Sequence, residues 1–421
     1  MNKRHNPHRI GKLVTRGVLP FAAALLLGPA GALAAITSSP ASTTPSSIWQ
    51  VDTSANPGST TFSNSAFQSV SASGPKEAWS VGRTMNDQAL DQPLAEHWNG
   101  SSWTSATVPV PAGQQAVLNA VDDLGPSNAW AVGTSFGGGV GATPAGVTLI
   151  EHWNGTSWSI VPSPNPAAGV SGDTDVLNAI SGTGPSDLWV AGSDLNEATD
   201  TISLLFEHWN GTAWTAVASP TPEGSAEFAS GITAISPTNV WAVGTDETDG
   251  LTDVSAHWNG HAWSIVPTPE ITSAHDQNAL TGVSSDGPSN VWASGFADNV
   301  DGQNLRVPFV LHWNGTRWVL TKVPTLGSEG SMLNGIQVIS PTDAWAVGQT
   351  QESDGAILDL TEQFDGSSWA IQSSPQPGML GGLSSNSLDS VTSAGGGDLF
   401  AVGERFTPGQ EGMRTLAISK G

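Results

Sequence analysis

The sequence of 421 residues predicts an all-β protein built from repeated four-stranded antiparallel sheets, and two recurring motifs support this prediction. Composition agrees with it, because 49 Gly and 28 Pro with only 12% charged residues suit a chain of many short strands and tight turns. After residue 34, no segment shows the 3.6-residue apolar period of an amphipathic helix.

The first motif is an aromatic residue followed by two small or aliphatic residues and a Gly. It occurs seven times, and its aromatic residues are Trp79, Trp130, Trp189, Trp241, Trp292, Trp345 and Phe400. Their spacings are 51, 59, 52, 51, 53 and 55 residues. A period near this length indicates a repeat architecture, in which each unit buries its apolar face against its neighbours.

The second motif, His-Trp-Asn-Gly-x-x-Trp, follows the first motif in each repeat but the last. Its copies lie at 97–103, 152–158, 208–214, 257–263 and 312–318, with a divergent copy at 363–369. Trp49 resembles the end of one more copy, and with it every one of the 18 Trp residues has a place in the repeat. Trp is therefore predicted to be a packing residue of each repeat.

Asn-Gly in the second motif predicts a β-hairpin with a two-residue type I′ turn. In the copy at 152–158 this turn would pair Trp153 with Thr156, His152 with Ser157 and Glu151 with Trp158. Side chains alternate between the faces of a strand, so both Trp residues would lie on one face and His152 on the other.

Segments 177–181 and 188–192 indicate two more strands, so each repeat supplies four. Four antiparallel strands per repeat of about 50 residues are typical of a propeller blade. The seventh repeat has only three strands, near 388–391, Phe400 and 413–419, and the isolated segment 47–51 could supply the fourth. We therefore expect residues 47–421 to form a seven-bladed β-propeller of four-stranded antiparallel blades, closed by the N-terminal strand completing blade seven.

The N-terminus indicates export. Five basic residues precede the apolar run 18–27, and small residues at 32–34 suit a cleavage site, so 1–34 is predicted to be a signal peptide. The alternative is an uncleaved membrane anchor. Residues 35–46 form a Ser/Thr/Pro-rich linker. The expected product is a monomer that is extracellular or retained at the cell surface, and with no Cys it has neither disulfides nor Cys-linked lipid.

Without the signal peptide, the chain keeps 8 Lys and Arg against 37 Asp and Glu, a net charge of −29. This charge repels phosphate backbones and anionic membranes, which argues against nucleic acid or membrane as a partner. The acidity favours either simple solubility outside the cell or attraction of cations and basic partners.

The repeats resemble kelch-like propellers, the family that includes the propeller domain of galactose oxidase. The likeness rests on a second strand that ends in Gly and a later turn that leads to a Trp, as in 189–192 followed by Trp214. It implies a fold and no function. The copper enzymes of that family need a Tyr–Cys cofactor and sialidases need a Tyr nucleophile, whereas this chain has neither Tyr nor Cys.

The histidines of the second motif are predicted to be structural, since each belongs to a different repeat: His97, His152, His208, His257 and His312. His275 and Asp276 lie outside the repeat pattern, in a connection between repeats. They are the catalytic candidates for a rival function, a secreted hydrolase or lyase that uses carboxylates at the channel mouth and His275 as base.

Acidic residues recur in the loops that follow the first motif. Asp246, Asp249, Asp298 and Asp301 are candidate Ca²⁺ ligands, because Ca²⁺ prefers carboxylate and carbonyl oxygens. The alternative is an ordinary solvated loop, and no other cofactor is expected. The favoured function is a secreted, non-enzymatic binding or scaffold propeller that recognises an extracellular glycan or protein on this acidic loop face.

Overall fold

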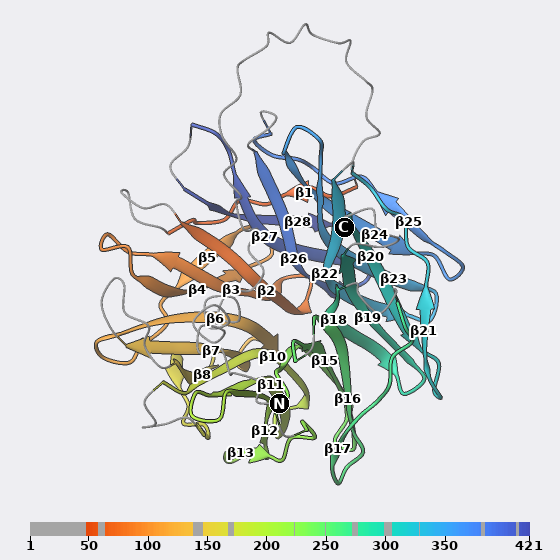
Figure 1. Cartoon of the computed structure of the whole chain (residues 1–421). Coiled ribbons are helices and arrows are strands. Elements are labelled where there is room, and N and C mark those ends of the chain that lie inside the picture. The colour runs from red at the N-terminus through yellow and green to blue at the C-terminus, as the bar shows by residue number, and fades with distance from the viewer. Residues whose placement is uncertain are drawn as a thin grey trace, which may run out of the picture.

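The computed structural model describes residues 48–57, 64–137, 146–166, 172–222, 224–248, 250–271, 277–298, 305–327, 329–379, 384–409 and 412–421 (Figure 1). The predicted signal peptide and linker lie outside these residues. Within them every regular element is a β-strand, which confirms the all-β prediction. No helix in the described ranges is long and apolar enough to cross a membrane.

In the described residues, four sheets contain four consecutive antiparallel strands each. They are β2 (Ser65–Gly74), β3 (Glu77–Met85), β4 (Asp91–Trp98) and β5 (Trp103–Ala106); β6 (Gln114–Asp123), β7 (Ala129–Gly137), β8 (Gly146–Trp153) and β9 (Trp158–Ile160); β10 (Thr174–Gly184), β11 (Asp187–Asn196), β12 (Thr201–Trp209) and β13 (Trp214–Val217); β14 (Glu227–Ser236), β15 (Asn239–Asp246), β16 (Thr252–Trp258) and β17 (Trp263–Ile265).

The remaining strands repeat the pattern within one larger sheet. It contains β18 (Gln277–Gly287), β19 (Asn290–Asp298), β20 (Arg306–Trp313) and β21 (Trp318–Thr321); β22 (Gly330–Ser340), β23 (Asp343–Gln351), β24 (Ile357–Phe364) and β25 (Trp369–Gln372); β26 (Ser385–Gly395), β27 (Asp398–Phe406), β28 (Arg414–Lys420) and β1 (Gln50–Val51). Single parallel bridges join its three groups of four strands, and each of these groups is called a sheet below, like the four separate ones. In the last group, β1 pairs antiparallel with β28 through Gln50–Ser419 and Val51–Ile418. The predicted repeat of four antiparallel strands is confirmed.

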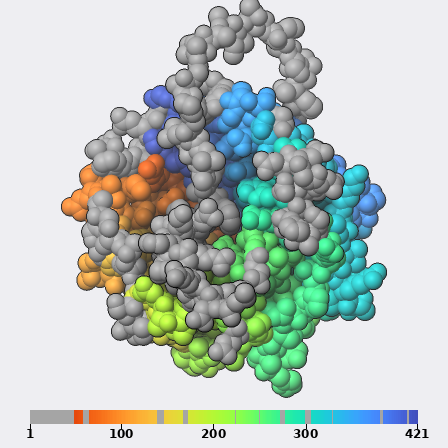
Figure 2. All heavy atoms as spheres, viewed as in Figure 1, coloured from red at the N-terminus to blue at the C-terminus, as the bar shows by residue number. Residues whose placement is uncertain are grey.

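Consecutive sheets lie beside one another around a common centre, with the orange first sheet next to the blue last one (Figures 1 and 2). One aromatic contact recurs between them. The ring centroid of Trp189 on β11, for example, lies 4.9 Å from that of Trp258 and 5.6 Å from that of Trp263 in the next sheet. The corresponding groups are Trp79 with Trp153 and Trp158, Trp130 with Trp209 and Trp214, Trp241 with Trp313 and Trp318, Trp292 with Phe364 and Trp369, Trp345 with Trp49, and Phe400 with Trp98 and Trp103.

The Gly of the first motif is explained by a β-bulge in the innermost strand of each sheet. At Gly192, which pairs with Leu177, an added Cβ would lie 1.8 Å from the carbonyl oxygen of Val176, so no side chain fits. The register shifts directly after Leu177, where Asn178 is the extra residue. Equivalent bulges contain Gln68, Asn119, Ser230, Thr281, Asn334 and Asp389.

Polar side chains at the bulges link neighbouring sheets. Four such bonds between described residues run from Asn119 to the Leu177 carbonyl (2.9 Å), Asn178 to Ala229 (2.9 Å), Thr281 to Leu333 (2.8 Å) and Asn334 to Leu388 (2.9 Å). Each acceptor directly precedes the bulged residue of the next sheet. Each of these four bulges therefore contributes a side-chain hydrogen bond to the backbone of the neighbouring sheet.

The predicted register of the hairpin is wrong. Trp153 pairs with Trp158 and His152 with Ser159, so four residues and not two form the loop. Gly155 has φ +91°, whereas Asn154 is not among the residues with positive φ. The Asn154 side-chain oxygen instead accepts hydrogen bonds from the N–H groups of Thr156 (2.9 Å) and Ser157 (3.1 Å). The predicted common face of the two Trp residues survives, because they are now direct cross-strand partners.

This geometry predicts that the side-chain oxygen at position 154 is required. Asn154→Ala and Asn154→Gly should each lower the free energy of unfolding by about 1 kcal/mol, because both leave the two N–H groups without their acceptor. Asn154→Asp should be nearly neutral, since Asp365 makes the same two bonds, each 2.9 Å, in the divergent copy. Urea denaturation of the three variants tests this, and a neutral Asn154→Gly would refute it.

Candidate functional site

In every sheet the strands end on two opposite sides. One side carries the connection from the second strand to the third and the connection to the next sheet, and we call this side the loop edge. In the β14–β17 sheet it includes the end of β15 at Asp246 and the start of β16 at Thr252. The opposite edge carries the Asn-Gly hairpins. Asp246 and Asp298, two of the predicted calcium ligands, lie at this loop edge, at the ends of β15 and β19.

The predicted calcium ligands are engaged with protein groups where the structure describes them. Asp298 forms a bidentate ion pair with Arg306, with Nε–Oδ1 2.7 Å and Nη2–Oδ2 2.9 Å. Asp246 accepts hydrogen bonds from the N–H and hydroxyl of Thr248. Asp249, Asp301, His275 and Asp276 lie outside the described residues. Among described residues, no group of three His, Asp or Glu could hold a metal ion.

Arg306 was missed because its role depends on strand register. It lies directly opposite Asp298 across β19 and β20, and its guanidinium also lies 4.1 Å from the ring centroid of Phe296. In the antiparallel register of β19 and β20, pairing Gly295 with Phe309 places Asp298 opposite Arg306. The ion pair makes Asp298 a poor candidate for a calcium ligand, because its charge is already compensated.

The motif histidines pack against tryptophans of their own sheets. His208 stacks on Trp189 with ring centroids 4.4 Å apart, and its Nε2 lies 2.7 Å from Oδ1 of Asp187. The other four repeat this arrangement with Glu77 or Asn at the Asp187 position, as His97–Glu77, His152–Asn128, His257–Asn239 and His312–Asn290. These contacts agree with the predicted structural role.

Charged cross-strand pairs at the loop edge differ from sheet to sheet. Asp175 faces Asp194, Glu227 faces Asp246, and Arg405 faces Arg414. Burial raises the pKa of Asp194, against a hydrogen bond with Asp175 that lowers it. Burial, more than the charge of Asp246, also raises the pKa of Glu227. A hydrogen bond between Asp175 and Asp194 requires a proton on one of the two carboxyls, whereas Arg405 and Arg414 are like charges placed directly opposite each other, which destabilises a sheet.

The last sheet carries a further pair of acids on its two innermost strands, Asp389 on β26 and Glu404 on β27. Burial and the nearby charge of Glu404 raise the pKa of Asp389 well above its ordinary value, while Arg83 opposes the shift. Burial also raises the pKa of Glu404. Asp389 is the bulged residue of its strand and lies 3.3 Å from the side-chain nitrogen of Asn334. Protonated carboxyls at this position are what the rival enzymatic function would need.

A buried glutamate precedes the motif histidine or its replacement in four repeats: Glu96, Glu151, Glu207 and Glu362. Burial raises the pKa of Glu151, Glu207 and Glu362 to about 8. The carboxylate of Glu96 accepts a hydrogen bond from the N–H of Ala55 (3.1 Å), which comes from the segment after β1. The recurrence of Glu before His-Trp was visible in the sequence, but its burial depends on the neighbouring sheet.

Comparisons with known proteins bear on the fold. No family model matches the chain, and no curated protein sequence matches it. A solved ulvan lyase of polysaccharide lyase family PL25 is 9% identical, with TM-score 0.51 over 88% of this chain and 96% of that chain. Ycf48 from Cyanidioschyzon merolae is 12% identical, with TM-score 0.48 over 88% of this chain and 98% of that chain.

A lectin from Aleuria aurantia, solved in complex with Fucα1-6GlcNAc, is 14% identical, with TM-score 0.40 over 74% of this chain and 96% of that chain. The ulvan lyase similarity supports a β-propeller fold and leaves the function open. A specifically kelch-like character is not shown, and that part of the resemblance remains a prediction.

The buried glutamates predict stability that falls as pH rises. The folded chain holds a proton on Glu151 up to about pH 8, whereas the unfolded chain loses it near the ordinary value of 4.5. Between these values the folded state binds more protons, so the free energy of unfolding decreases by up to about 1.4 kcal/mol per pH unit for each such group.

Glu151→Gln should therefore raise the free energy of unfolding at pH 8 and make it less dependent on pH. Glu329→Gln serves as the matched control, because Glu329 is exposed. Urea midpoints from pH 4.5 to 8 provide the measurement. A Glu151→Gln variant that is less stable than the parent at pH 8 would show that the charged carboxylate is needed in the fold.

Proposed function

We propose that residues 47–421 form a seven-bladed β-propeller, closed by the N-terminal strand, which is exported and binds an extracellular glycan at its loop edge without catalysis. Closure is supported by contacts between the chain ends. Phe400 packs on Trp98 (5.3 Å) and Trp103 (5.6 Å), and Trp49 packs on Trp345 (5.5 Å). These repeat the aromatic contact made between consecutive sheets.

The binding function rests on one observation. Packing positions are nearly identical in every repeat, whereas the cross-strand pairs at the loop edge change from acidic to basic between sheets. Residues that differ in charge from repeat to repeat, on a backbone that is otherwise the same, are the ones that can select a ligand. Carboxylates and hydroxyls at this edge suit sugar hydroxyl groups, which both donate and accept hydrogen bonds.

A glycan array probed with protein recovered from the culture medium tests export and binding together. We expect Asp194→Asn, at the loop edge, to weaken binding about tenfold, equivalent to about 1.4 kcal/mol. Asp286→Asn provides the control, since Asp286 is an exposed Asp at the hairpin edge. Equal effects of the two substitutions would place the ligand elsewhere, and an absence of any glycan bound would contradict the function.

The raised pKa values of Asp389 and Glu404 favour a second candidate, a glycan hydrolase or lyase with a protonated carboxyl on the innermost strand. The proposed base His275 lies outside the described residues. The two candidates differ in turnover, because an enzyme would release sugar ends from the glycan that it binds. Release that is lost in Asp389→Asn would favour the enzyme, and binding without release favours the binding module.

A further inference from the structure

Two arginines at the loop edge of the last sheet have an unusual environment for so acidic a chain. Arg405 of β27 and Arg414 of β28 are direct cross-strand partners. Burial, and the charge of Arg414, lower the pKa of Arg405. Both side chains contain a buried Nε without a hydrogen-bond partner. Two opposed guanidinium groups destabilise the sheet, so an anion between or beside them would stabilise it.

No acid of the described residues forms an ion pair with either arginine. The ion pairs found there involve His97, His208 and Arg306, and neither Arg405 nor Arg414. Glu404 precedes Arg405 on β27 and therefore projects from the opposite face of the strand. Asp52 accepts a hydrogen bond from the hydroxyl of Ser419 (2.8 Å). The positive charge of the two arginines is thus available to a ligand.

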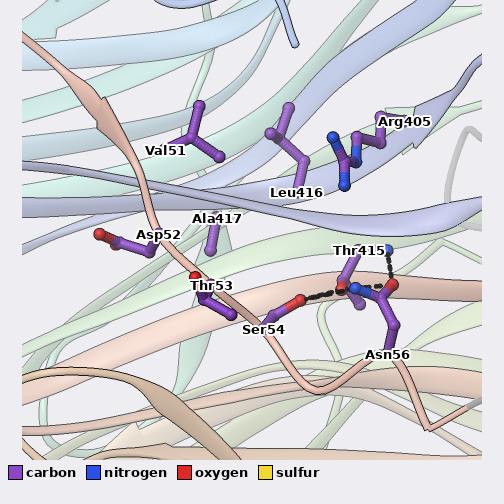
Figure 3. A pocket seen from close by; sticks show the side chains of 9 residues that line it. All are labelled: Val51, Asp52, Thr53, Ser54, Asn56, Arg405, Thr415, Leu416 and Ala417. Atoms are coloured by element: carbon purple, nitrogen blue, oxygen red, sulfur yellow. Dashed lines mark hydrogen bonds between the residues drawn. The ribbon is translucent and has the colours of Figure 1, made fainter. Parts of the chain in front are cut away.

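Arg405 lines a pocket of about 200 Å³ at the outer side of the same sheet (Figure 3). The pocket lies where segment 52–56 continues from β1 along β28. The N–H of Asp52 donates to the Ala417 carbonyl (2.9 Å), and Asn56 accepts hydrogen bonds from Thr415. The polar lining of the pocket includes the hydroxyls of Thr53, Ser54 and Thr415, the carboxamide of Asn56 and the carboxyl of Asp52. Burial raises the pKa of Asp52, which favours the neutral form of this acid. One guanidinium beside hydroxyl and amide groups is a combination suited to an acidic sugar.

The hydroxyl and amide groups are held in fixed positions. The Asn56 side-chain oxygen accepts hydrogen bonds from the N–H and the hydroxyl of Thr415, both 2.8 Å. The Asn56 side-chain nitrogen donates to the hydroxyl of Ser54 (3.0 Å), and that hydroxyl also contacts the hydroxyl of Thr415. Such a network costs little further ordering when a ligand binds, which favours affinity.

We propose that this pocket binds a carboxylate-bearing sugar, with Arg405 holding the carboxylate and the hydroxyl-rich segment 53–56 contacting the sugar hydroxyls. A planar guanidinium can donate two parallel hydrogen bonds to a carboxylate, and Arg414 adds positive charge beside it. The proposal rests on the glycan-binding function above and names its ligand class. It also explains why two of the few arginines are placed side by side in an acidic chain.

D-glucuronate and D-glucose are the probes, because they differ only in the carboxylate at C6. Titration calorimetry of the mature chain should show saturable glucuronate binding and at least about tenfold weaker glucose binding. Arg405→Gln should lose about tenfold or more in glucuronate affinity, and Arg414→Gln a smaller factor. Arg317→Gln is the control, since Arg317 is exposed in a hairpin loop of another sheet.

Folding failure is distinguished by the melting temperature. Removing one of two opposed charges should leave the melting temperature of Arg405→Gln equal to or above that of the parent, so lost binding in a stable variant supports the site. Acetate and an acidic peptide test other sources of the carboxylate. Binding of either at least as tightly as glucuronate, or unchanged glucuronate binding in Arg405→Gln, overturns the proposal.

The array result separates this proposal from the general function. If glycans bind to the mature chain but glucuronate does not, or if Arg405→Gln leaves array binding intact, the acidic-sugar pocket is wrong and the binding function stands. If no glycan binds at all, both are wrong.

Discussion

The contact between sheets through three aromatic rings is the interaction on which the rest of the structure depends. The second strand of one sheet presents a Trp to two Trp residues of the next sheet, as Trp241 does to Trp313 (4.6 Å) and Trp318 (5.3 Å). The first pair is tilted and the second is edge-on, and aromatic pairs of this kind contribute about 0.5–1.5 kcal/mol each beyond the burial of their area. A chain without disulfides thus obtains its cohesion from one packing unit used repeatedly.

A second constraint fixes the inner strands. The bulge at Asn178 brings the carbonyl of Val176 so close to Gly192 that only Gly is possible there. The same bulge turns a polar side chain toward the backbone of the next sheet. With the hairpin side occupied by tryptophans and the inner strands by these hydrogen bonds, the loop edge is left free to vary, and the charged pairs lie there.

Periodicity could be predicted from the sequence because it depends on local pattern. The spacing of the two motifs gave the four-stranded unit and the common face of Trp153 and Trp158. The predicted hairpin register is wrong because the side-chain oxygen of Asn154 accepts hydrogen bonds that close a longer loop. The prediction uses only the backbone preference of Asn-Gly for a two-residue turn. Local pattern also says nothing of what faces a residue across an interface, so the burial of Glu151 was not foreseen.

The candidate site was harder still, since its chemistry depends on cross-strand partners. Asp298 was expected among calcium ligands, but Arg306 lies opposite and neutralises it. Arg405 and Arg414 are nine residues apart in sequence, and only the register of β27 and β28 makes them neighbours. Single residues of a repeat protein acquire their function from the strand alignment, which must be known before sites are assigned.

The claim that the ring of sheets closes through Trp49 is tested most directly by truncating that side chain. Trp49 is buried against Trp345 as Trp263 is buried against Trp189. Our account predicts that Trp49→Ala and Trp263→Ala lower the free energy of unfolding by similar amounts, about 3–5 kcal/mol, in urea denaturation. A Trp49→Ala variant with the stability of the parent, beside a strongly destabilised Trp263→Ala, would contradict closure by the N-terminal strand.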